Sequence, residues 1–156
     1  MLVQLNRNTG ARDFSATATG LPLNPAALPA TTGPNPVVAV LGPTARVNGL
    51  AQHLPAGWSV RHAKDLDDVS PDELLLFTGP AIRDVALARR LLPGRTQLVA
   101  LVDDAAPAET VAAVLTAGAD ACVRGGQPAI LASHLVACRR RQVAGRWTQL
   151  NRQDRI

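Results

Sequence analysis

Two adjacent carboxylates, Asp103 and Asp104, directly follow the apolar run 97–102. At the end of a buried parallel strand, they would lie on the rim where open α/β sheets bind ligands, and carboxylates there could ligate a cation. Arg124 follows another short apolar run, so it should lie nearby and could pair with one of them. We favour a structural salt bridge or a solvated loop over a catalytic or metal-binding role.

The other residues capable of chemistry form no site in the sequence. Thr78-Gly79-Pro80 could bind an anion through backbone N–H groups, although a simple turn between strand and helix explains it better. The histidines are far apart in the expected layout and lack an accompanying nucleophile or acid. Cys122 and Cys138 lack metal-ligand spacing and are expected to be buried, reduced and unpaired. We therefore expect no metal, no cofactor and no enzymatic activity.

Five short apolar runs, each suited to a buried parallel strand, alternate with helical patterns. The runs are 37–41, 58–60, 74–77, 97–102 and 121–123. This alternation predicts the α/β class: a doubly wound, five-stranded parallel sheet with right-handed crossovers and helices on both faces. The strand order natural at this size is 2-1-3-4-5, as in flavodoxin-like folds.

Helical spacing predicts which side chains between these runs face the core. A first helix capped by Thr44 would turn Val47, Leu50, Ala51 and Leu54 inward, and a later one would do so with Val111, Val114 and Leu115. The polar stretch 64–70 has room for one or two helical turns. The last helix is expected over 128–143, with Pro128 in its first turn.

Composition and charge set the domain organisation. Of 156 residues, 47% are hydrophobic and only 3% aromatic, so the core must be aliphatic. Residues 1–35 show no sustained period and are expected to be a disordered leader, followed by one domain over 36–143 and a basic segment over 144–156. No apolar run reaches the roughly 18 residues of a membrane span and no secretory signal is seen, so a cytoplasmic location with no membrane partner is expected.

The segment 98–141 has an expected buried strand, a helix, the turn AGAD at 117–120, a short strand and a final helix that ends in RRR. In this order it resembles the second half of CheY-like receiver domains of bacterial response regulators. GWSVRHAKD resembles the second strand of that family, and PDELLLF resembles the approach to its phosphorylated aspartate. The resemblance covers residues 37–141 and implies a CheY-like fold.

The phosphorylation pocket of that family is degenerate here. A working receiver uses two acids after strand one for Mg²⁺, an aspartate ending strand three, a Ser or Thr ending strand four, and a Lys after strand five. The corresponding residues are Leu41, Gly42, Phe77 or Thr78, Val102 and Arg124. No Asp or Glu occurs between Asp13 and Asp65, so no shift of alignment restores the acidic pair.

Residues 145–156 resemble the linker and first strand of the winged-helix output domain in OmpR-type regulators. A frayed basic tail is an equally good explanation. If the resemblance holds, the chain is a receiver half, and DNA is reached only through an absent or separate output domain.

These observations favour a non-enzymatic pseudo-receiver that regulates transcription or signalling through dimerisation or contact with a partner protein. Its expected surface combines two helices and the strand between them, with small residues facing outward: Ala108, Ala112, Thr116, Ala129 and Ala132. Two alternatives stay open. One is an active phosphorelay receiver with a displaced acceptor such as Asp103, and the other is a small-molecule-binding flavodoxin-like domain.

Overall fold

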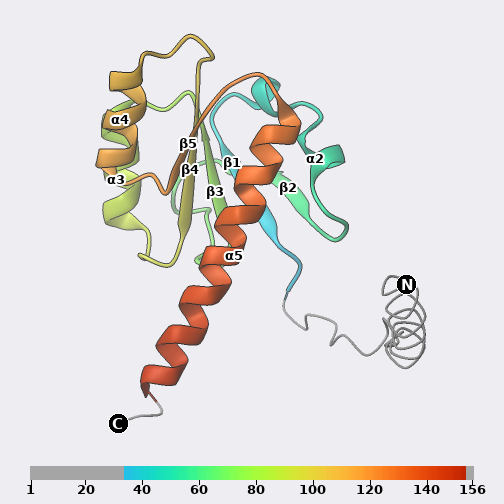
Figure 1. Ribbon diagram of the computed structural model, residues 1–156, viewed down its shortest axis with the longest axis vertical. Helices are drawn as coiled ribbons and strands as arrows, with labels where there is room; N and C mark the ends of the chain where they lie inside the picture. Colours follow the sequence, from blue (N-terminus) through green and yellow to red (C-terminus); the bar gives the residue numbers. More distant parts are fainter. Residues whose placement is uncertain (1–33, 154–156) are drawn as a thin grey trace, which may run out of the picture. The chain divides into compact units, whose positions relative to one another are not determined.

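A computed structural model of the protein describes residues 34–153, and its elements alternate as the apolar runs predict (Figure 1). The five strands are β1 (Val37–Leu41), β2 (Ser59–His62), β3 (Leu74–Thr78), β4 (Gln97–Val102) and β5 (Ala121–Arg124). All pairs are parallel and their order is β2-β1-β3-β4-β5. The predicted α/β class and strand order are confirmed. The predicted leader falls almost wholly outside the described residues.

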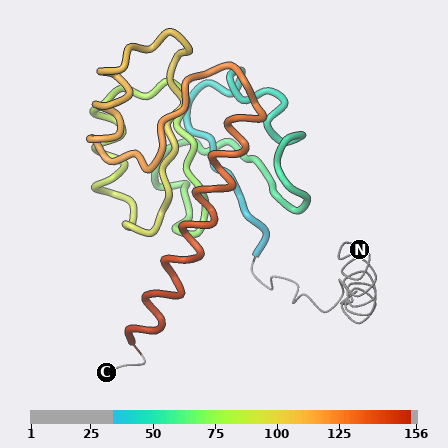
Figure 2. The backbone as a smooth tube through the Cα atoms, in the orientation of Figure 1, coloured from blue at the N-terminus to red at the C-terminus, as the bar shows by residue number. Residues whose placement is uncertain are grey.

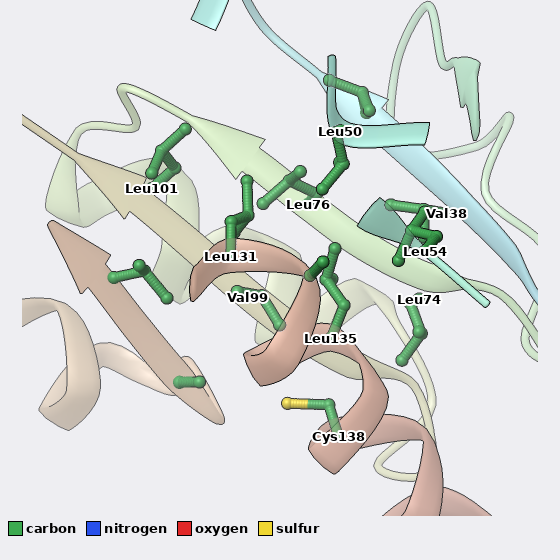
Figure 3. Close-up of a cluster of buried hydrophobic side chains, with 14 residues drawn as sticks. Val38, Leu50, Leu54, Leu74, Leu76, Val99, Leu101, Leu131, Leu135 and Cys138 are labelled. Carbon is green, nitrogen blue, oxygen red and sulfur yellow. The ribbon is translucent and has the colours of Figure 1, made fainter. Parts of the chain in front are cut away.

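One face of the sheet is covered by α2 (Leu50–His53) and α5 (Pro128–Gln153), as Figure 3 shows. Leu76 of β3 and Val99 of β4 lie beneath Leu131 and Leu135, and all four are at most 3% exposed. Cys138 continues this layer along α5, where it is fully buried. Branched aliphatic side chains therefore supply the core that the shortage of aromatic residues required.

The opposite face is covered by α3 (Ile82–Leu91) and α4 (Ala108–Ala117). Val85 and Ala88 of α3 and Val114 of α4 pack against Leu75, Leu98 and other strand residues of the alternate register. Because side chains alternate along each strand, both faces of β3 and β4 are buried, and this explains their unbroken apolar runs. The tube in Figure 2 follows the chain as it crosses from one layer to the other.

The AGAD turn connects α4 to β5 and contacts α3. Gly118 ends α4 with φ of 123°, and Arg89 of α3 packs directly against it. The Arg89 guanidinium donates hydrogen bonds to Gly118 O at 2.9 Å and to Asp120 Oδ2 at 2.7 Å. Asp120 Oδ2 also accepts the Leu98 N–H at 2.7 Å. The motif therefore stabilises the fold and does not itself indicate phosphoryl chemistry.

The prediction of one continuous helix from Thr44 to Leu54 is wrong. The chain forms a 3-10 turn η2 (Thr44–Val47) and then the short α2, because Gly49 between them has a φ of 80°. Leu50 and Leu54 are buried as expected, but Ala51 is exposed. A left-handed residue interrupts the helical ladder, so the apolar spacing is not continued by one helix.

The predicted helical turns over 64–70 are also absent from the structure, which has only turns and bends there. Asp side chains instead accept hydrogen bonds from backbone N–H groups of this stretch. Asp65 accepts the Asp68 N–H at 3.0 Å, and Asp68 accepts the Lys64 N–H at 3.1 Å. Such local side-chain bonds compete with helix formation. The crossover between β2 and β3 therefore contains a loop in place of a helix.

The last helix is longer than predicted, because α5 has 26 residues and continues to Gln153. It runs past the edge of the sheet, as Figure 1 shows. Buried Gln142 fixes it to the body by donating to Arg95 O at 3.3 Å, and Arg146 pairs with Asp72. Residues 144–153 are thus helical, and the β-strand expected from the winged-helix resemblance is not formed. Their role as a linker stays a prediction.

Candidate functional site at the carboxyl edge of the sheet

The structure brings the six predicted pocket residues to one edge of the sheet. Leu41 pairs with Phe77 across β1 and β3, and Val102 pairs with Arg124 across β4 and β5. Each of these residues is the last, or next to last, of its strand, so parallel pairing places their side chains on the same rim. The structure therefore places these residues together, and their identity as a degenerate phosphorylation pocket stays a prediction.

Gly42 and Thr78 fill the centre of this edge. Gly42 has a φ of 113°, and a Cβ there would lie 2.5 Å from both the carbonyl O and Oγ1 of Thr78. Thr78 is only 2% exposed, and its hydroxyl donates a hydrogen bond to Leu41 O at 3.4 Å. The space after β1 therefore has no room for an acidic side chain at position 42 unless the end of β3 moves.

Asp103 pairs with Arg46, which follows β1 in η2, at 2.6 Å. Arg124 was expected to pair with Asp103 or Asp104, and for Asp103 that expectation is corrected. The physical reason is that Arg46 of η2 lines the same small hollow as Leu101 of β4, two residues before Asp103, whereas Arg124 is exposed at the end of the edge strand β5. The Asp103 side chain is 71% exposed, which makes this a surface ion pair of small energetic weight.

The edge offers no acidic cluster for a cation. Among residues 34–153, no three His, Cys, Asp or Glu side chains lie close enough together to hold a metal ion. The rim instead presents Arg46 and Arg124 with Asp103 and Asp104. Asp103 is paired with Arg46, and the buried Thr78 hydroxyl is bonded to the Leu41 carbonyl. These residues of the rim therefore do not form an oriented pair of nucleophile and base.

The predicted contact face is partly assembled. Ala108, Ala112, Thr116 and Ala129 are exposed, but Ala132 is 2% exposed and belongs to the core, because it lies beside Leu131 on the buried side of α5. Leu115 was expected inward and is 42% exposed. It lines a shallow hollow of about 400 Å³ with Ala112 and Cys122. Cys122 is half-buried and unpaired, and desolvation raises its pKa.

A second hollow was not predicted, and we call it the α3 groove. It has a volume of about 400 Å³ and runs between α3 and the 64–67 loop. Its lining is Leu41, Leu66, Phe77, Leu87 and Leu91, with Lys64, Asp65, Asp67 and Asp84 among them. The only sequence signal was Leu87 and Leu91, four residues apart and outside the inward spacing of α3; they are 45% and 60% exposed.

No protein-family profile and no curated protein matches the sequence. Solved structures do match the fold. A CheY-like response regulator receiver domain protein from Methanospirillum hungatei JF-1 is 21% identical, with a TM-score of 0.55, over 72% of this chain and 99% of that one. The BeF3-activated DrrB receiver domain is 16% identical, with a TM-score of 0.54, over 65% of this chain and 95% of that one. None of the helices described between residues 34 and 153 is long and apolar enough to cross a membrane.

The matches to these two solved structures, together with the strand order, show that the chain has the fold of a CheY-like receiver domain.

Proposed function

We propose that this chain is a signalling module of the receiver type that acts through protein contact and is not switched by aspartyl phosphorylation. The observation that carries the proposal is the packing of Gly42 against Thr78 at the carboxyl edge. An acyl-phosphate site needs a carboxylate acceptor and oxygen ligands for Mg²⁺ to offset the charge of the transferred group. Here a glycine and a bonded threonine hydroxyl stand at that centre.

The displaced carboxylate Asp103 is a poor substitute acceptor. Its bridge to Arg46 at 2.6 Å is exposed, and no three His, Cys, Asp or Glu side chains among residues 34–153 lie together to hold the Mg²⁺ that the transfer needs. Its neighbour Asp104 is the only other carboxylate in the same loop. We therefore expect no phosphoryl adduct at this edge.

The decisive experiment is incubation of the full chain with acetyl phosphate and Mg²⁺, followed by intact-mass measurement. An unchanged mass is the expected result, with a phosphorylatable receiver domain as the positive control. A mass increase of one phosphoryl group that disappears in Asp103→Asn would establish the phosphorelay alternative and overturn this proposal.

Contact between two copies would use the surface formed by α4, β5 and the start of α5. This surface exposes Leu115 and Ile130, at 42% and 49%, between small residues such as Ala112. Small side chains allow close helix approach, and the exposed apolar residues supply area to bury. Sedimentation equilibrium should show a dimer that Ala112→Glu dissociates. Ala56→Glu, an exposed change in the turn between α2 and β2 and outside this surface, is the matched control. A monomer at high micromolar concentration would contradict dimerisation.

A further inference from the structure

Two apolar features of the described chain are exposed and lie on opposite faces of the sheet. The α3 groove belongs to the layer of α3 and α4, where Leu41 and Leu66 pack. The second feature is the α5 tip, residues 147–153, whose Trp147 and Leu150 are 64% and 53% exposed. Large apolar side chains exposed together mark surfaces that bind other molecules.

The two features have complementary charge. The α3 groove carries three aspartates and one lysine, which is a net charge of −2. The α5 tip holds one arginine, Arg152, and no acidic residue, and four further arginines lie before it in α5 from Arg139 onward. Arg139 and Arg146 are held by bonds to Asp72, whereas Arg140 is exposed two helical turns before Trp147 and so on the same face.

The features also match in spacing. Trp147 and Leu150, three residues apart, form a one-turn apolar ridge on α5. Leu87 and Leu91, four residues apart, form a ridge of the same length on α3, with Phe77 at the floor. The groove exists because a loop replaces the crossover helix between β2 and β3, so a helix from elsewhere can occupy that position against α3.

We propose that the α3 groove binds the α5 tip of a second copy of this chain. The same copy cannot supply it, because α5 packs on the other face and is tied to Asp72 and Arg95, which precede β3 and β4 at the amino edge. Charge complementarity identifies the occupant: a helix–helix pair of two α5 segments would oppose arginine to arginine, whereas the groove offers aspartates.

This contact is heterologous, since different surfaces of the two copies meet. Repetition of one such contact produces a ring or an open chain and does not stop at a two-fold dimer. It is independent of the α4–β5–α5 surface in the proposed function, and the two can be told apart by the variants that abolish each.

The test uses the full chain carrying Trp58→Phe, which leaves Trp147 as the only tryptophan. We expect the Trp147 emission to shift to the blue with concentration, in parallel with the sedimentation coefficient. Leu87→Glu in the groove should weaken association at least about tenfold, as should Trp147→Glu. Ile82→Glu is the matched control, because Ile82 is 47% exposed on the same helix but does not line the groove. Added salt should weaken the contact.

Mixing Leu87→Glu with Trp147→Glu chains provides the specific readout. Each variant keeps one intact surface, so the mixture should form a one-to-one complex that neither variant forms alone. An unchanged Trp147 emission, association that survives Leu87→Glu, or association abolished only by Ala112→Glu would each overturn the proposal. So would an α5 tip that binds vesicles of phosphatidylcholine and phosphatidylserine while the chain stays monomeric.

Discussion

Gly42 and Thr78 occupy one small volume at the carboxyl edge, where a Cβ on Gly42 would lie 2.5 Å from two oxygen atoms of Thr78. One of these oxygens is the backbone carbonyl, so a rotamer change of Thr78 cannot relieve the contact. The glycine thus allows β1 and β3 to end side by side without a functional side chain between them. Several consequences can be measured.

Gly42→Ala should lower the free energy of unfolding by about 2–4 kcal/mol, because it adds a steric clash to an unfavourable positive φ. Gly126→Ala separates the two causes. Gly126 also has a positive φ, 103°, but nothing lies within 4 Å of the added Cβ, so its cost should be about 1 kcal/mol. Urea denaturation of both variants measures the difference. Equal losses would show that the contact with Thr78 has no energetic weight.

Glu73→Gln should destabilise the fold by about 1–2 kcal/mol at neutral pH. The Arg61 guanidinium donates to both Glu73 carboxylate oxygens at 2.7 Å, and this hydrogen bonding holds the pKa of Glu73 below its usual 4.5. A lowered folded-state pKa gives stability that is present above pH 4.5 and is lost as pH falls through the folded-state value. The free energies of unfolding of the variant and of the native chain should therefore become equal in acid.

Thermal or urea unfolding between pH 3 and 7 measures that convergence. Asp104→Asn, which removes an exposed carboxylate in the loop after β4, is the control and should change stability by less than about 0.5 kcal/mol throughout. A difference between Glu73→Gln and native chain that is independent of pH would contradict the assignment to the ionised carboxylate.

Asp120→Asn should cost about 2–3 kcal/mol, because Asp120 Oδ2 accepts hydrogen bonds from both Arg89 and the Leu98 backbone. Arg89 is one-quarter exposed, so the charge is partly withdrawn from solvent. Asp103→Asn provides the contrast: its bridge to Arg46 is exposed, and its removal should cost less than about 0.5 kcal/mol. Chemical denaturation should rank the two variants in this order.

Trp147→Ala should leave the stability of the monomer within about 0.5 kcal/mol of the native value, since the ring is mostly exposed. Leu135→Ala in the same helix should cost about 2–5 kcal/mol, because its side chain is fully buried between α5 and the sheet. Unfolding measured at low protein concentration keeps self-association out of the comparison. A large loss for Trp147→Ala would show that the α5 tip contributes to the fold of its own chain.

The fold class could be predicted from the sequence because its signals are local, whereas the strand order was predicted as the one natural for a doubly wound sheet of this size. A strand buried on both faces must be largely apolar, and the unbroken apolar runs at 74–77 and 98–102 show this directly. The meeting of the six predicted pocket residues at one edge was predictable for a similar reason, because parallel pairing brings the ends of the strands together.

Only the tertiary structure decided which side chains are buried, which residues form ion pairs and where a groove forms. Spacing along α5 could not show that Ala132 joins the core while Ala129 faces solvent, because that depends on where the sheet lies. Nor could it choose Arg46 over Arg124 as the partner of Asp103, since both follow strands at the same edge. The α3 groove depends on a helix that fails to form over 64–70, where aspartates bond to the backbone. A cavity is a property of elements distant in the chain, and only their packing creates it.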